Sequence, residues 1–175
     1  QKHLYRTAKR FVSGLVPEEA RMPTGPNLAA VNRGRTPPPS PELLATYEAL
    51  YDGTINYVDD VLRAFFSHLE DLGLVESTVV IITSDHGEEF LEHGRMTHEQ
   101  VYNECLQVPL IVVGPGVAGG SRSPGLTMTV DLTPTILDLF GVTQPNRLIG
   151  RSLLPLLEGK EPGHRHVAVL GACSS

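Results

Sequence analysis

Apolar residues recur every three or four positions after Ser40, which is the spacing of one face of an α-helix. Ser40 and Pro41 suit the cap and the first position of a helix, and Gly73 suits the residue that follows its end. The sequence therefore predicts one long helix over 41–72, with Gly53 as its weak point. The apolar positions are Leu43, Leu44, Tyr47, Leu50, Tyr51, Ile55, Val58, Leu62, Phe65, Phe66 and Leu69.

Short apolar runs further along the chain predict strands. The run 78–83 (TVVIIT) is β-branched and apolar on both faces, which is typical of a strand inside a parallel sheet, and 110–113 is of the same type. Helices are predicted over 131–140 and 152–157, and a last strand over 166–170. This order of elements predicts an α/β fold with a mostly parallel sheet and flanking helices.

Residues 1–40 have no sustained period and are rich in proline and glycine. We expect them to form a basic arm in loop conformation, with a short helix near 5–12, while 41–175 form the main body. The arm holds seven basic and two acidic residues, a net charge of +5, against −11 for the body. A basic arm can bind nucleic acid, but the acidic body and the absence of Trp argue against such a partner.

Composition excludes several classes of protein. A hydrophobic fraction of 41% supports a core, and the apolar runs are too short to span a bilayer. Two cysteines cannot form a disulfide framework or a four-cysteine zinc site. No signal-peptide pattern is present, and a first residue of Gln1 leads us to expect a piece of a longer protein, so no compartment is predicted.

Residues that can ligate a metal come directly after the predicted strand 78–83. Asp85 and His86 come at its end, on a turn that Gly87 permits, and His93 and His98 keep the following loop polar. Ligands of α/β sheets sit beyond the carboxyl ends of strands, and an aspartate oxygen with a histidine nitrogen is a usual donor pair for a divalent metal. The alternative is that Asp85 only caps a helix. The histidine spacing does not fit a helical zinc-protease motif.

The sequence resembles the sulfatase family of the alkaline phosphatase superfamily over 42–158. The resemblance implies an alkaline phosphatase-like sandwich, of which this chain would be an incomplete, C-terminal part. The motifs that carry the resemblance are Ser84-Asp85-His86-Gly87-Glu88, Glu92-His93-Gly94, Val108-Pro109-Leu110-Ile111-Val112, Gly114-Pro115-Gly116, the run from Val130 to Asp138, and Gly150-Arg151-Ser152-Leu153.

The resemblance also implies roles for single residues. Asp85 and His86 would ligate the catalytic metal. His98 stands where relatives often carry lysine, so it would bind the sulfate or phosphate oxygens or protonate the leaving oxygen. Glu88 and His93 are expected beside the ligands rather than on the metal. A nitrogen ligand favours manganese, zinc or iron over calcium, the metal of relatives with Asp-Asn at these positions.

The family's nucleophile is a Cys, Ser or Thr followed by Pro and Arg at two-residue intervals. Neither Cys105 nor Cys173 fits this motif. The nucleophile, a formylglycine in many relatives, is therefore expected upstream and absent from this chain. The resemblance then implies a fragment that is inert alone and that supplies metal ligands to a sulfuric ester hydrolase.

The sequence leaves several other functions open. The same fold serves phosphodiesterases, phosphonate monoester hydrolases and phosphotransferases, and a noncatalytic binding domain could keep it. The expected substrate is a sulfate or phosphate ester of a small molecule, glycan or lipid. An incomplete sheet exposes an apolar face, so we also expect a homodimer or aggregation through that face.

Overall fold

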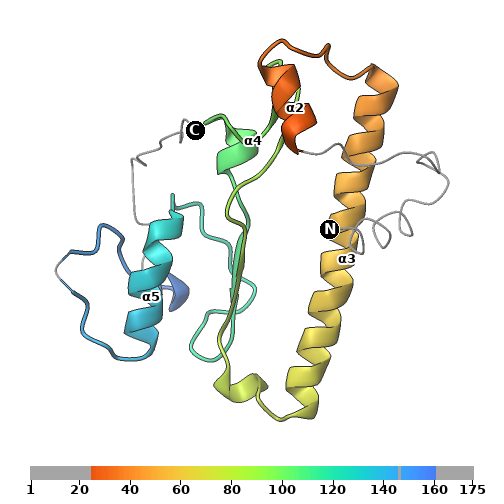
Figure 1. Ribbon diagram of the computed structural model, residues 1–175. Coiled ribbons are helices and arrows are strands. Elements are labelled where there is room, and N and C mark those ends of the chain that lie inside the picture. The colour runs from red at the N-terminus through yellow and green to blue at the C-terminus, as the bar shows by residue number, and fades with distance from the viewer. Residues whose placement is uncertain (1–24, 146, 161–175) are drawn as a thin grey trace. The chain divides into compact units, whose positions relative to one another are not determined.

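The structure is a computed structural model that describes residues 25–145 and 147–160 (Figure 1). These residues form two compact units, one of 25–74 with 86–107 and the other of 75–85 with 108–145 and 147–160. The predicted helix near 5–12 and strand over 166–170 lie outside the described residues. The first unit contains α2 (Gly25–Asn32), α3 (Pro41–Asp71), β2 (Glu89–Phe90), β3 (Met96–Thr97) and α4 (Asn103–Leu106). The second contains η1 (Val75–Ser77), β1 (Val80–Thr83), β4 (Leu110–Val113), η2 (Thr129–Asp131), α5 (Leu132–Leu139) and α6 (Leu154–Leu157).

The long helix is confirmed as α3. The Ser40 hydroxyl accepts a hydrogen bond from the Leu43 amide at 3.3 Å, and Pro41 occupies the first turn. After the helix, Gly73 takes a φ of +66°, which glycine adopts without strain. The helix continues unbroken through Gly53, which is buried, as are Thr46, Tyr47 and Leu50. The buried positions all lie in the N-terminal half of α3, so this half forms the packed part of the helix.

Helix α2 lies where a loop was expected, so the loop prediction for this stretch is wrong. The Asn32 side chain forms two hydrogen bonds with the backbone of Met96 in β3, each 2.7 Å long. Helix-forming Ala29 and Ala30 favour the local conformation. The paired bonds then fix the end of α2 on a strand 64 positions away in the sequence. The division of the chain at residue 40 stays a prediction.

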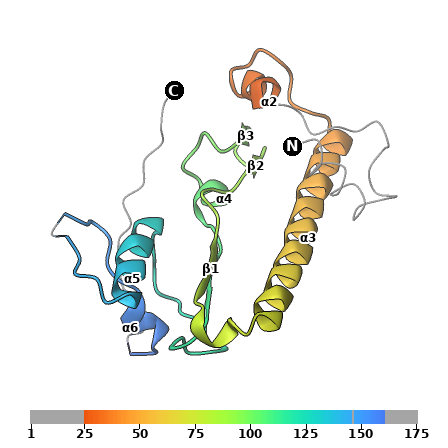
Figure 2. The same cartoon turned by 60° about the horizontal axis from the view of Figure 1, so that its bottom comes forward.

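Strand β1, labelled in Figure 2, pairs antiparallel with β4, and Val80 lies opposite Val113 and Thr83 opposite Leu110. The expectation that this pair is parallel is wrong. The apolar pattern of a strand does not report its direction, and here the connection over 84–109 returns the chain to the end at which β1 finishes. The residues of β1 are half-buried or exposed, so the fully buried position expected for this strand is not observed among the described residues. Strand β4 alternates in exposure, with Ile111 50% and Val113 40% exposed.

A buried polar network joins α5 to the segment before α6. The Asp131 carboxylate accepts hydrogen bonds from the backbone amides of Met128 and Arg151, each at 2.9 Å. Thr135 donates to the Asp131 carbonyl at 2.6 Å and accepts from the Leu153 amide at 2.8 Å. Asp131 stands at the cap position of α5, as predicted, but its carboxylate makes no cap bond to that helix. It instead holds two loop segments together.

Within the two described stretches, no helix has both the length and the apolar character needed to cross a membrane.

Candidate metal and catalytic site

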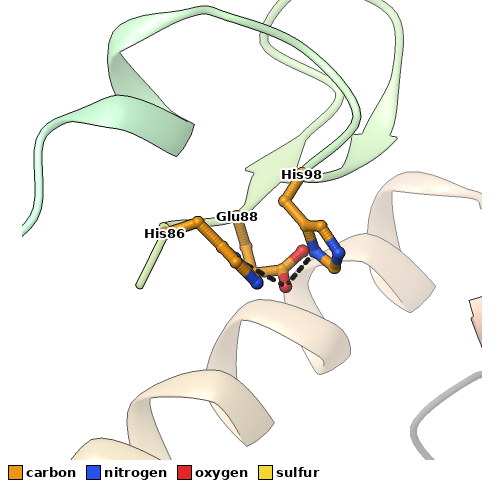
Figure 3. A group of neighbouring side chains, drawn as sticks. All are labelled: His86, Glu88 and His98. Atoms are coloured by element: carbon orange, nitrogen blue, oxygen red, sulfur yellow. Dashed lines mark hydrogen bonds and ion pairs between the residues drawn. The ribbon is translucent and has the colours of Figure 1, made fainter. Parts of the chain in front are cut away.

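Three polar side chains of the first unit meet at the turn that follows residue 85. Donor atoms of His86, Glu88 and His98 all lie within 4.8 Å of one another (Figure 3). His98 Nδ1 is 2.8 Å from Glu88 Oε1, and His86 Nδ1 is 4.0 Å from the same oxygen. The imidazole rings of His86 and His98 stack with centroids 3.8 Å apart and planes inclined by 27°. The structure thus brings together His86 and His98, which were predicted as site residues, and Glu88, which was predicted to lie beside the ligands.

The hydrogen-bond partners of the two histidines indicate which ring nitrogen carries a proton. His86 Nδ1 lies 2.9 Å from the Gly87 carbonyl oxygen, and His98 Nδ1 lies beside the Glu88 carboxylate. Carbonyl and carboxylate oxygens only accept, so Nδ1 of each ring is the donor. In the neutral ring the lone pair then resides on Nε2, which is the atom available for a metal or a proton.

Backbone packing fixes the turn that carries His86 and Glu88. The Gly87 amide donates to the Cys105 carbonyl at 2.8 Å. A Cβ atom at Gly87 would lie 1.9 Å from the carbonyl oxygen of Glu104, so only glycine allows this approach. Cys105 itself is buried, and burial followed by the charge of Glu89 raises the pKa of its thiol. A buried thiol with a raised pKa is typical of a structural cysteine and not of a reactive one.

A short hairpin positions His98. Strands β2 and β3 pair antiparallel, with Glu89 opposite Thr97 and Phe90 opposite Met96. Thr97, directly before His98, is nearly buried and has a φ of +71°, a conformation that costs a non-glycine residue about 1 kcal/mol or more. The backbone strain therefore falls next to a candidate catalytic residue.

Helix α3 contributes Tyr51 to the surroundings of the site. Its ring contacts the Phe90 ring edge to face, with centroids 5.4 Å apart. Burial, and after it the negative charge of Glu88, raises the pKa of Tyr51. The Tyr51 hydroxyl accordingly keeps its proton at neutral pH and lies within the electrostatic reach of the Glu88 carboxylate.

Asp85 is exposed, and its carboxylate accepts a hydrogen bond from the Ser84 hydroxyl at 3.3 Å. Asp85 offers carboxylate oxygens and His86, in the gathered group, offers an imidazole nitrogen, and these donor types suit zinc, manganese or iron. The chemistry of the residues therefore fits the divalent metal that the resemblance implies.

His93 belongs to a different group of side chains in the same unit. Its ring stacks on Tyr102 with centroids 3.6 Å apart, and its Nδ1 lies 3.2 Å from Glu89 Oε1 and 3.8 Å from Glu104 Oε2. Glu89 is only 1% exposed and also accepts from the His93 amide at 2.8 Å. This contact closes the turn between β2 and β3, so His93 has a structural explanation.

Sequence reasoning missed two features of this region and one coincidence elsewhere. Neither the pairing of Glu88 with His98 nor the contact of Asn32 with β3 follows from a local pattern.

The spacing of the family's nucleophile motif, Thr-x-Pro-x-Arg, does occur at Thr143, Pro145 and Arg147, in an exposed loop after α5. Gln144 ties this loop to α5 through the Asp138 carboxylate and the Pro134 carbonyl, so the loop also has a structural explanation.

Two aspartates of α3 form a surface ion-pair group with an arginine of the same helix. Asp59 and Asp60 both pair with Arg63 on the exposed face of the helix, with side chains 69% and 44% exposed. Surface pairs of this kind contribute little to stability, and they satisfy both carboxylates.

Comparison with known proteins gives a consistent result. A family model described as Sulfatase matches residues 11–142. N-acetylglucosamine-6-O-sulfatase of Bacteroides thetaiotaomicron is 38% identical over 115 residues, which cover 64% of this chain and 21% of that protein. Human arylsulfatase K is 37% identical over 108 residues, 62% of this chain and 20% of that protein.

Solved structures share the fold. Phosphonate monoester hydrolase SpPMH from Silicibacter pomeroyi has a TM-score of 0.71 at 31% identity and covers 83% of this chain and 32% of its own. BT4656, solved in complex with its substrate D-glucosamine-2-N,6-O-disulfate, has a TM-score of 0.65 at 31% identity, covering 81% of this chain and 29% of its own. The predicted alkaline phosphatase-like α/β fold is therefore confirmed, with only part of it present and the sheet not closed.

The chain spans about a fifth of the length of the curated relatives it matches. The family match covers most of its residues, including the turn with Asp85 and His86 and the hairpin before His98. The chain therefore belongs to the sulfatase family.

Proposed function

We propose that this chain supplies metal ligands and a leaving-group helper to a metal-dependent sulfatase-like hydrolase that cleaves sulfate esters. The observation that carries the proposal is the meeting of His86, Glu88 and His98 within 4.8 Å, in a chain of the sulfatase family. In this group His86 supplies a nitrogen donor for the metal, and the His98 ring lies beside it, where it can reach an ester held at that metal.

Asp85 and His86 are the proposed metal ligands, through a carboxylate oxygen and through Nε2. The bond of His86 Nδ1 to the Gly87 carbonyl supports this role, because a backbone acceptor on one ring nitrogen orients the other. A divalent metal, when bound, neutralises charge on the nonbridging oxygens of the ester. The candidate metals are manganese, zinc, iron and calcium.

His98 is the proposed catalytic residue, and it donates a proton to the leaving oxygen. Its Nε2 atom is the one that remains for this task, because Nδ1 is engaged by Glu88. The attacking nucleophile, expected as a formylglycine, belongs to the whole protein and not to these 175 residues.

The proposed substrate is a sulfated glycan, chosen over a small-molecule or lipid ester. The curated relative from Bacteroides is an N-acetylglucosamine-6-O-sulfatase, and BT4656 was solved with a disulfated glucosamine. A second candidate is a phosphonate monoester hydrolase, which the TM-score of 0.71 with SpPMH favours. Homodimerisation through exposed sheet residues such as Ile111 stays a prediction.

The test is hydrolysis by the whole protein of aryl sulfate, glucosamine 6-sulfate and aryl phosphonate under one set of conditions. We expect sulfate ester turnover, and His98→Ala is expected to lower kcat by ~10²-fold, the loss typical of one well-placed electrostatic group. His68→Ala, an exposed histidine on α3, is the control. Faster turnover of the phosphonate supports the second candidate, and turnover of none of them supports a noncatalytic binding domain.

Metal content measures the ligand assignment independently of turnover. Asp85→Asn and His86→Ala are expected to lower the metal recovered with the purified protein, measured by elemental analysis, which also identifies the metal, while His93→Ala leaves it unchanged. Full metal content in Asp85→Asn overturns the assignment of that ligand.

A further inference from the structure

Glu88 and His98 form a carboxylate–imidazole pair inside the candidate site. The 2.8 Å contact joins Glu88 Oε1 to His98 Nδ1, and the two side chains are 27% and 47% exposed (Figure 3). Glu88 is the more buried of the two, and a hydrogen bond to a carboxylate is stronger and better defined where water competes less.

Both members of the pair are tethered by their own backbone. Glu88 follows Gly87, whose amide bonds to the Cys105 carbonyl at 2.8 Å and whose lack of a Cβ allows contact with α4. His98 follows Thr97, which is nearly buried and lies in β3. The pair therefore joins two anchored segments, ten positions apart in the sequence.

The His98 ring is restrained at two of its surfaces. Glu88 holds the Nδ1 edge, and the His86 ring covers one face at a centroid distance of 3.8 Å. Two other glutamates of the loop are used elsewhere, because Glu89 accepts from the His93 amide and Glu92 from the Phe90 amide. Glu88 is thus the carboxylate of this loop that orients His98.

We propose that Glu88 is a positioning residue that keeps the His98 proton on Nδ1 and turns Nε2 toward the leaving oxygen of the substrate. This inference rests on the proposed function for its catalytic part only. In the step, the nucleophile of the whole protein forms its bond to sulfur, the bond from sulfur to the leaving oxygen breaks with its electron pair moving to that oxygen, and the doubly protonated ring gives its Nε2 proton to the same oxygen. The neutral ring keeps the Nδ1 proton, and Glu88 stays a carboxylate throughout.

The pairing is tested first without turnover, by long-range ¹H–¹⁵N correlation spectra of the histidine rings at alkaline pH. The spectra are expected to show His98 protonated at Nδ1 in the wild type. In Glu88→Ala the proton moves in large part to Nε2, because its acceptor is gone, whereas Glu88→Gln keeps an oxygen acceptor and part of the wild-type pattern. Glu92→Gln, in the same loop, is the matched control and leaves the His98 signals unchanged. A wild-type ring protonated at Nε2 overturns the inference.

The catalytic part is tested in the whole protein with aryl sulfates of increasing leaving-group pKa. Glu88→Ala is expected to lower kcat by ~10-fold or more for phenols of high pKa and much less for nitrophenol, because only poor leaving groups need the proton. A structural defect would lower all rates equally. If Glu88→Ala lowers kcat equally for all aryl sulfates although the His98 tautomer has changed, the positioning role is overturned but the pairing is not. If His98→Ala does not change sulfate turnover, the proposed function itself is overturned.

Discussion

Two buried carboxylates, one in each unit, differ in how many of their oxygens accept hydrogen bonds. Asp131 is fully buried, and its two oxygens accept backbone amides at 2.9 Å from Met128 and Arg151. Glu89 is 1% exposed, and its Oε1 accepts the His93 amide, but its Oε2 has no hydrogen-bond partner among the described residues. Both carboxylate oxygens of Asp131 accept hydrogen bonds, whereas only one carboxylate oxygen of Glu89 does.

The difference extends to the surroundings of Glu89. Glu104 Oε2 and the side-chain amide of Gln100 are also buried without hydrogen bonds within the part of the chain that the structure describes. Unsatisfied buried polar atoms cost about 1–3 kcal/mol each. They lie in the same unit as His86, Glu88 and His98, so this unit holds buried polar atoms without hydrogen bonds, while the Asp131 network of the other unit is closed.

The largest effect is expected from alanine at the glycine that fixes the site. Gly87→Ala places a Cβ 1.9 Å from the Glu104 carbonyl oxygen, and backbone cannot yield as a side chain does. We expect a loss of about 3 kcal/mol in local stability, because overpacking of this severity lies at the upper end of the usual range. The readout is alkylation of buried Cys105, followed by peptide mapping, which should speed up by about 100-fold.

Gly94→Ala is the control for this substitution. Gly94 has a φ of +76°, but no neighbouring atom lies within 4 Å of where the added methyl group would stand, so this variant tests conformational strain without the clash. We expect a cost of about 1 kcal/mol. If both variants label Cys105 at the same rate, close backbone approach is not what holds the turn.

The sequence was sufficient for features that depend on local pattern. Helix α3 follows from periodic apolar residues with Ser40 and Gly73 at its ends, and the family follows from the several motifs between 84 and 153 taken together. The helical conformation of α2 was missed because its end is held by Asn32 on a strand far along the chain. Such a contact has no local signature.

Strand direction and side-chain pairing could not be read in the same way. An apolar run predicts burial for β1, but the antiparallel partner β4 is set by the path of the connection. The approach of Glu88 to His98 depends on the hairpin of β2 and β3, whose two-residue strands carry too little pattern to predict. The ligand types were predictable, and their geometry was not.

A smaller effect separates the two carboxylates directly. Asp131→Asn replaces one accepting oxygen by an NH₂ group that faces a backbone amide, so we expect a loss of about 2 kcal/mol in the free energy of unfolding. Glu89→Gln can keep its accepting oxygen toward His93 and place NH₂ where Oε2 has no partner, so we expect a change below about 1 kcal/mol. Urea unfolding followed by circular dichroism measures both. Equal losses would remove the distinction between a closed network and an open one.

The smallest effect concerns pH and the carboxylate of Asp138 in the second unit. Hydrogen bonds from Ser152 and then from Gln144, the latter 2.6 Å long, lower the pKa of Asp138 below its ordinary value. A lowered pKa in the folded state means that the ionised group contributes stability above the unfolded-state pKa of about 4, and that this contribution is lost as pH falls through the lower folded-state value. Asp138→Asn should therefore reduce stability near neutral pH slightly, and the difference from the wild type should shrink below about pH 4. Unfolding free energies measured across this range check the sign. If the difference in unfolding free energy between the wild type and Asp138→Asn grows on acidification, the two donors do not hold Asp138 ionised. The second unit would then contain one carboxylate, Asp131, that is fully hydrogen-bonded, and another, Asp138, that is not stabilised in this way.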